Sequence, residues 1–219
     1  MKRWLPLAAL LVVAACAKAP TLVVPPAPPP VMLTPAPMPA GGRPGMAIPE
    51  RLPDGSWATP NRNLTPAGAV WHLRSALNVA ALACRGPLEA TMVADYNALL
   101  GRQKTAFASA QTALERETKA GGGDWRDRYD DQATRLYNFF AQDFARDAFC
   151  TAAAQVLSEA QTVTPAALPA FAAARLAQLE RPFTDFFAAY ERWRSGAMVP
   201  AGEVAPAVPR LTVDVSTLG

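Results

Sequence analysis

Residues 65–87 read TPAGAVWHLRSALNVAALACRGP, and this stretch carries the start, the apolar face and the end of one helix. Thr65 followed by Pro66 has the form of a helix start, because threonine caps the first turn and proline suits the first helical position. Arg85-Gly86-Pro87 should end the helix, since glycine closes helices and proline cannot continue them. Between these signals, apolar residues recur at the three- and four-residue spacing of one helix face: Val70, Leu73, Leu77, Ala80 and Cys84.

The same spacing continues to about residue 195, in a region that is rich in alanine and leucine and nearly free of proline. We expect a second, longer helix from Pro87, with Gly101 as its weak point. It should end at Gly121-Gly122-Gly123, because glycine adopts the left-handed conformations that close a helix. A third helix should follow Asp124, since aspartate is a good N-cap.

Two further helical segments complete the region. The first extends from about Asp143 to Gln161. The second begins at Thr164-Pro165 and should kink or split at Pro182, because an internal proline removes a helical hydrogen bond. Four to six helices with short connections predict an all-α fold, an antiparallel helical bundle in a domain spanning residues 54–195.

The segments on either side of this domain are rich in proline. Of the 22 prolines, 13 lie between Ala17 and Pro60, so residues 16–53 are expected to form a disordered, semi-rigid tether. Residues 196–219 form a tail rich in proline and valine. Because Leu211, Val213 and Val215 alternate with polar residues, the tail is expected either to be disordered or to add a strand to the sheet of a partner.

The first residues carry an export signature. Lys2 and Arg3 precede a short apolar run that ends in Val13-Ala14-Ala15-Cys16. This run is about half of the roughly 20 residues that a helix needs to span a bilayer. The arrangement resembles the signal of a bacterial lipoprotein. The resemblance implies a signal peptide at residues 1–15, cleavage before Cys16, and fatty acyl chains on Cys16 that hold the chain to a membrane.

The resemblance also implies a location and a redox state. Ala17 stands where an aspartate commonly retains lipoproteins at the inner membrane, so we expect the periplasmic side of the outer membrane rather than the periplasmic face of the inner membrane. That compartment permits disulfides. Cys84 and Cys150, the two remaining cysteines, are therefore expected to form one; the alternative is a pair of buried free thiols.

Composition argues against several classes of function. The formal charge of +3 falls to +1 without Lys2 and Arg3, so nucleic acid is not expected as a partner. His72 is the only histidine, which removes zinc sites built on histidine pairs and favours a structural or surface role for this residue. The glycines at 121–123 lie between helices and lack the lysine of a phosphate-binding loop. We therefore expect no metal and no cofactor.

Paired carboxylates are the remaining enzymatic option, because glycan-cleaving enzymes use such acids. The candidates are Glu89, Asp124 with Asp127, and Asp130 with Asp131. Asp131 precedes Arg135 by four residues, the spacing of an ion pair on a helix surface. Glu89 lies in the first turn of its helix, where a carboxylate is favoured anyway. These acids are better explained as surface residues, so we expect no catalytic residue and no enzymatic activity.

Aromatic residues offer a site of another kind. Most recur at helical spacing, which favours packing in a core over a ligand pocket. Residues 54–63, before the first helix, group a turn dipeptide, an aromatic ring and polar side chains. Either this segment is a strap that packs Trp57 across the bundle, or it forms a recognition edge with the first helix, made of Trp57, Asn61, Arg62, Trp71 and His72.

These observations favour a lipid-anchored periplasmic protein that acts as a non-catalytic binding or scaffolding component of the cell envelope. Its expected partners are the membrane, through lipid on Cys16, and an envelope protein or peptidoglycan. A carrier that holds a small apolar molecule between the helices is the alternative. A peptidoglycan-directed hydrolase is the third interpretation.

Overall fold

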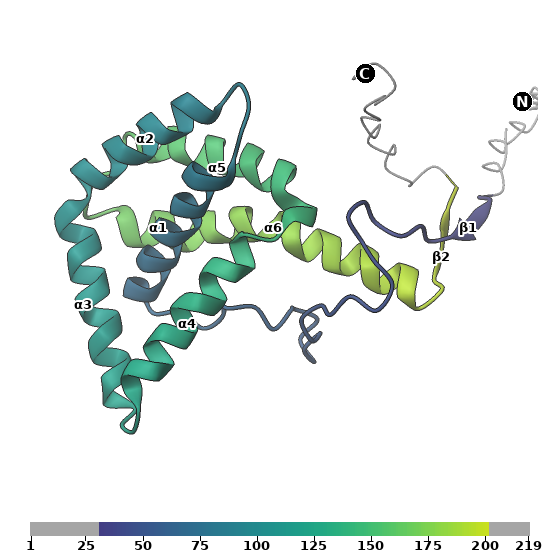
Figure 1. Ribbon diagram of the computed structural model, residues 1–219, viewed down its shortest axis with the longest axis horizontal. Helices are drawn as coiled ribbons and strands as arrows, with labels where there is room; N and C mark the ends of the chain where they lie inside the picture. Colours follow the sequence, from purple (N-terminus) through teal and green to yellow (C-terminus); the bar gives the residue numbers. More distant parts are fainter. Residues whose placement is uncertain (1–30, 202–219) are drawn as a thin grey trace, which may run out of the picture. The chain divides into compact units, whose positions relative to one another are not determined.

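Six α-helices, joined by short turns, make up most of the chain that the computed structural model describes, residues 31–201 (Figure 1). The predicted all-α helical bundle is confirmed. The helices are α1 (Pro66–Ala83), α2 (Glu89–Arg102), α3 (Lys104–Ala120), α4 (Trp125–Phe140), α5 (Arg146–Ala160) and α6 (Leu168–Arg194). A 3-10 turn, η1 (Asp143–Ala145), precedes α5, and the short strands β1 (Leu33–Pro35) and β2 (Met198–Pro200) lie outside the bundle. Within the described residues, no helix has the length and apolar character that crossing a membrane requires.

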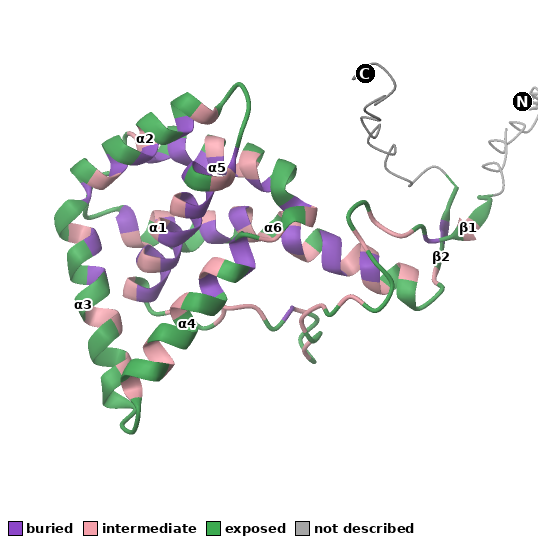
Figure 2. Cartoon of the chain, viewed as in Figure 1, coloured by how far each residue is buried: buried purple, intermediate pink, exposed green. Residues whose placement is uncertain are grey.

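Helix α1 lies at the centre of the bundle and packs against all five other helices, most extensively α6 and α3. It begins and ends where the sequence predicts: Thr65 Oγ1 accepts a hydrogen bond from the Gly68 amide, and Cys84 is the C-cap. Four of its apolar side chains are completely buried: Leu73, Ala76, Leu77 and Ala80. Figure 2 shows the buried positions on the faces that the helices turn toward one another. Burial of these apolar faces is the main driving force for the bundle.

The predicted single helix from Pro87 to Gly121 is wrong, because the chain breaks into α2 and α3 at Gln103. The Gln103 side chain is almost completely buried, and its Nε2 donates to the Val163 carbonyl at 2.7 Å. This bond spans 60 residues of sequence. Gly101 marks the weak point correctly, but a contact with a distant segment decides where the helix axis changes.

Helix α6 also differs from its prediction, because it is less interrupted than expected. It starts at Leu168, after a turn in which the Ala167 amide bonds to Thr164, and it continues through Pro182 as one helix. Aromatic side chains that follow this proline are buried, among them Phe183 and Phe187. Packing of these rings compensates for the hydrogen bond that the proline removes. The expected division at Pro182 is therefore wrong.

An aromatic cluster forms much of the core between α4, α5 and α6. Phe183 is fully buried and lies at its centre. Four other rings have centroids 4.8–6.3 Å from that of Phe183: Phe139, Phe140, Phe144 and Phe149. These are the distances of packed aromatic pairs. The rings thus fill the core with one another, as their helical spacing in the sequence predicts.

Residues 36–64 run across the bundle as an ordered strap, and β1 pairs antiparallel with β2. Tyr190 of α6 holds the strap: its hydroxyl accepts from the Met46 amide at 2.9 Å and donates to the Arg43 carbonyl at 2.8 Å. Gly41 approaches Phe144 so closely that a Cβ at this position would lie 2.9 Å from the Phe144 Cβ. The prediction of a disordered tether reaching residue 53 is therefore wrong from β1 onward.

The C-terminal segment needs a similar correction. The predicted tail of residues 196–219 includes β2, so its first part is ordered and pairs with β1 of the same chain. Its alternating residues Leu211, Val213 and Val215 lie outside the described residues. The predicted signal peptide of residues 1–15, the predicted lipidation site Cys16 and the first part of the predicted tether lie outside them too.

Cys84 and Cys150 form a disulfide. It joins the C-cap of α1 to the first turn of α5, as the sequence predicts. The two cysteines are separated by 66 residues, so the bond closes a loop that contains α2, α3 and α4.

Candidate functional site

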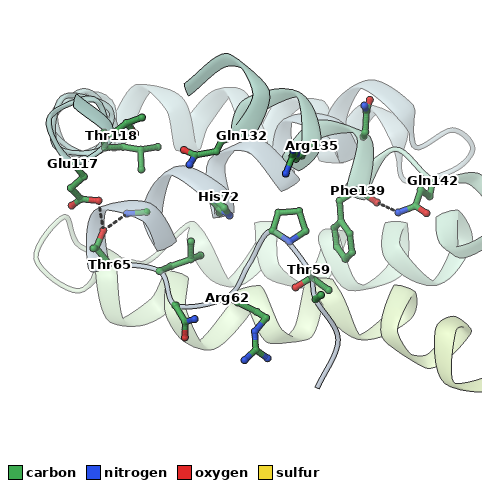
Figure 3. Close-up of a pocket in the computed structure, with 17 residues that line it drawn as sticks. Thr59, Arg62, Thr65, His72, Glu117, Thr118, Gln132, Arg135, Phe139 and Gln142 are labelled. Atoms are coloured by element: carbon green, nitrogen blue, oxygen red, sulfur yellow. Dashed lines mark hydrogen bonds between the residues drawn. The ribbon is translucent and has the colours of Figure 1, made fainter. Parts of the chain in front are cut away.

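A groove with a cavity volume of about 920 Å³ lies between the end of the strap, α1, α3 and α4 (Figure 3). This volume is within the range of ligand-binding pockets. Most of the residues that line it are polar: Thr59, Arg62, Asn63, Thr65, His72, Glu117, Thr118, Gln132, Arg135, Asn138 and Gln142. Apolar surface comes from Ala58, Pro60, Leu64, Leu114 and Phe139. The groove therefore offers both polar and apolar surface to a ligand.

His72 lies in the middle of the groove, between the strap and α4 (Figure 3). It is only 9% exposed, and burial lowers the pKa of its imidazole to about 4. The ring is therefore neutral at neutral pH. Its Nδ1 lies 2.9 Å from Asn61 Oδ1, so that Nδ1 carries the proton and Nε2 keeps a lone pair that can accept a hydrogen bond. Asn61 thus sets the hydrogen-bonding character of His72.

Arg62 is held at the strap side of the groove by Asp54 and Ser56. Its Nη2 lies 3.0 Å from Asp54 Oδ2, and its Nη1 donates to the Ser56 hydroxyl. Hydrogen bonds from Ser56 to the Asp54 carboxylate, reinforced by Arg62, lower the pKa of Asp54 to about 2. The charge of Arg62 is therefore already compensated within the protein.

The N-terminus of α1 forms one end of the groove. Thr65 Oγ1 caps the helix and donates to Glu117 Oε2 of α3 at 3.0 Å, a contact that Figure 3 shows. The carboxylate of Glu117 thus lies near the positive end of the α1 dipole, where a negative charge is favoured. This arrangement links α3 to the start of α1 and engages the only acidic residue among those that line the groove.

Helix α4 supplies the opposite wall through a stripe of exposed polar residues at three-residue spacing: Gln132, Arg135 and Asn138. The predicted ion pair between Asp131 and Arg135 is not formed. Within residues 31–201, Arg135 has no carboxylate within salt-bridge distance. Its guanidinium belongs to the groove, where its charge is available to a ligand.

A second, smaller cavity of about 20 Å³ adjoins the groove and shares His72, Leu114 and Gln132 with it. Trp71 and Tyr129 form its other side. The pKa of Tyr129 is raised, mainly by burial. Its hydroxyl has no hydrogen-bond partner among the described residues. The space is large enough for about one water molecule.

The structure places only some of the five residues of the predicted recognition edge at the groove. Arg62 and His72 line the groove. Asn61 does not line it but forms a hydrogen bond with His72. Trp57 is buried and packs edge-on against Phe187, with ring centroids 5.6 Å apart, so it belongs to the strap. Trp71 is half-buried beneath the Arg74 guanidinium. Whether the remaining residues bind a partner stays a prediction.

The α3 and α4 walls are the part of the groove that sequence reasoning missed. The polar stripe of α4 was a usable signal, because Gln132, Arg135 and Asn138 recur at near-helical spacing and precede the apolar pair Phe139-Phe140. Glu117 gave no such signal, since nothing near it in the sequence points to Thr65. Only the packing of α3 against α1 brings the two together.

The other predicted acids lie outside the groove. Glu89 is within 3.5 Å of Arg85 in an exposed pair at the start of α2. Asp124 precedes α4 as its N-cap, with Asp127 in the first turn, where acids favour helix formation. In residues 31–201 no group of three or more histidines, cysteines or acids is placed to hold a metal ion. Comparisons of the chain with protein-family models, curated proteins and solved structures returned no match.

Proposed function

We propose that this chain is a non-catalytic binding component of the cell envelope and that the groove beside His72 is its binding site. The observation that carries the proposal is the groove itself, an open cavity of about 920 Å³ whose polar lining includes a guanidinium without an ion-pair partner in residues 31–201. Hydrogen bonds within the protein hold the side chains of Arg62, Thr65 and His72 in place. A preorganised site of this kind favours binding, because little ordering is left to occur when the ligand arrives.

The lining residues favour binding over hydrolysis. Glycosidic bond cleavage ordinarily uses two carboxylic acids on either side of the bond. Glu117 is the single acid among the residues that line the groove, and its carboxylate is engaged by Thr65. The aromatic residues that a carrier of apolar molecules would use are packed against one another in the core.

The envelope location rests on the N-terminal segment. Its resemblance to a lipoprotein signal supports lipid attachment at Cys16 and an outer-membrane anchor. Between Cys16 and β1 lie 16 residues that include a run of prolines. If extended at about 3.1 Å per residue, this segment would span on the order of 50 Å and allow the domain to reach partners away from the lipid surface.

Crosslinking in living cells tests the proposal. A photoreactive amino acid replaces Asn138, which is exposed in the groove, and in a matched control it replaces Arg181, which is exposed on α6 and does not line the groove. A defined protein or glycan adduct is expected from position 138 and not from position 181. The same adducts from both positions, or none from either, would contradict the groove as a binding site. Release of glycan fragments by the purified chain would contradict a non-catalytic role.

A further inference from the structure

The charged side chains of the groove differ in whether the protein already engages them. Three charged side chains line it: Arg62, Glu117 and Arg135. Arg62 is paired with Asp54, and Glu117 accepts a hydrogen bond from Thr65. Arg135 has no such partner within residues 31–201. A ligand therefore meets one uncompensated positive charge, on the α4 wall.

The groove-lining residues on either side of Arg135 are neutral and suited to amides. Gln132 and Asn138 lie three residues before and after it on the same face of α4, and each offers a carbonyl oxygen and an NH₂ group. Across the groove, the neutral imidazole of His72 offers a hydrogen-bond acceptor. Gln132 lines both cavities beside His72, so amide-binding groups continue from Arg135 toward the buried histidine.

We propose that the groove binds an extended peptide by a carboxylate that pairs with Arg135, while backbone amides of the peptide bond to Gln132, Asn138 and His72. The inference rests on the proposed function of the groove. A guanidinium binds a carboxylate through two parallel hydrogen bonds. A dianionic phosphate fits less well, because Arg62 is already neutralised and the N-terminus of α1 is already next to the Glu117 carboxylate.

Two sources in the envelope share this chemistry. One is the C-terminus or an acidic side chain of a protein, and the other is the peptide portion of peptidoglycan, which carries carboxylates and D-amino acids. Both present a carboxylate next to peptide amides. The stereochemistry of the residue that bears the carboxylate separates the two.

A peptide titration of the full chain, purified without a histidine tag, tests the inference. The probes are N-acetyl-tetraalanine, whose one charge is its carboxylate, and the same peptide with a C-terminal amide. Because His72 is the only histidine, its imidazole provides a single, assignable NMR signal inside the groove. We expect the acid to bind roughly tenfold or more tightly than the amide, the size of a charge-assisted hydrogen bond.

Variants assign the preference to a residue. Arg135→Gln should lower the affinity for the acid to that for the amide, whereas Arg181→Gln removes the same charge outside the groove and should preserve the preference. A matching peptide that ends in D-alanine shows which source binds better, and tight binding of either acid supports the inference.

Three results would overturn the inference: equal affinity for acid and amide, a preference that persists in Arg135→Gln, or no change in the His72 signal with any peptide. If the neutral disaccharide of N-acetylglucosamine binds instead, the groove is a glycan site and only the peptide inference fails. Groove-specific adducts in the crosslinking experiment would keep the binding function intact in that case.

Discussion

Opening the Cys84–Cys150 disulfide should remove a large part of the stability of the domain. The bond closes a loop of 66 residues, for which the chain-entropy relation gives about 4 kcal/mol at 25 °C. Folded domains are stable by only about 5–15 kcal/mol, so this loss is severe. Chemical reduction isolates the loop-closure contribution, because it leaves both sulfur atoms in place.

Urea unfolding followed by tryptophan fluorescence, with and without reductant, measures the effect. Four tryptophans lie in different parts of the domain, so they report on the whole of it: Trp57, Trp71, Trp125 and Trp193. The double variant Cys84→Ala with Cys150→Ala should lose the same 4 kcal/mol or slightly more, since the buried Cys84 sulfur also loses packing. Reductant should leave this variant unchanged. A loss below about 1 kcal/mol on reduction, or two alkylatable thiols in the native unreduced protein, would refute the reasoning.

Three further predictions concern the strap, the groove and the core. Tyr190→Phe leaves the Met46 amide and the Arg43 carbonyl without their partner, so it should cost about 1–3 kcal/mol and speed proteolysis between residues 36 and 64; an unchanged cleavage rate would contradict the clamp. His72 has a pKa of about 4 in the folded chain against 6.5 for the unpaired residue, so the unfolded state binds its proton first and stability should fall by up to about 3 kcal/mol as the pH drops from 6.5 to 4. The unfolding free energy of His72→Gln should lack this part of the pH dependence. If the unfolding free energies of the two proteins fall in parallel between pH 6.5 and 4, His72 is not the cause. Phe183→Ala should cost about 3–5 kcal/mol in urea unfolding, whereas Leu82→Ala, at a side chain that is 65% exposed, should change stability by less than about 0.5 kcal/mol.

Local signals in the sequence were sufficient where the structure depends on near neighbours. Thr65, Pro66 and Gly86 set the ends of α1 through a side-chain cap, a fixed φ angle and a left-handed turn, all within a few residues. The aromatic core was predictable for a related reason, since helical spacing alone shows which rings share a face.

Contacts between distant residues explain where sequence reasoning failed. The break at Gln103 depends on the Val163 carbonyl, and the ordered strap depends on Tyr190, which lies more than 140 residues from Arg43 and Met46. The continuity of α6 through Pro182 depends on rings packed from α4 and α5. Nothing near these residues in the sequence carries that information.

The helical class and the limits of α1 were predictable from the sequence, because helix propensity, capping and periodicity act over a few residues. The cysteine pair was predictable for another reason, since only Cys84 and Cys150 remain besides Cys16. Of the groove, it indicated only Arg62 and His72, together with Asn61, which bonds to His72. The tertiary structure decided the rest, because the walls contributed by Glu117 and Arg135 face His72 only after α3 and α4 have buried their apolar faces against α1. A helix orients its polar side chains according to the face that it buries, and that face is chosen by the packing of the whole bundle.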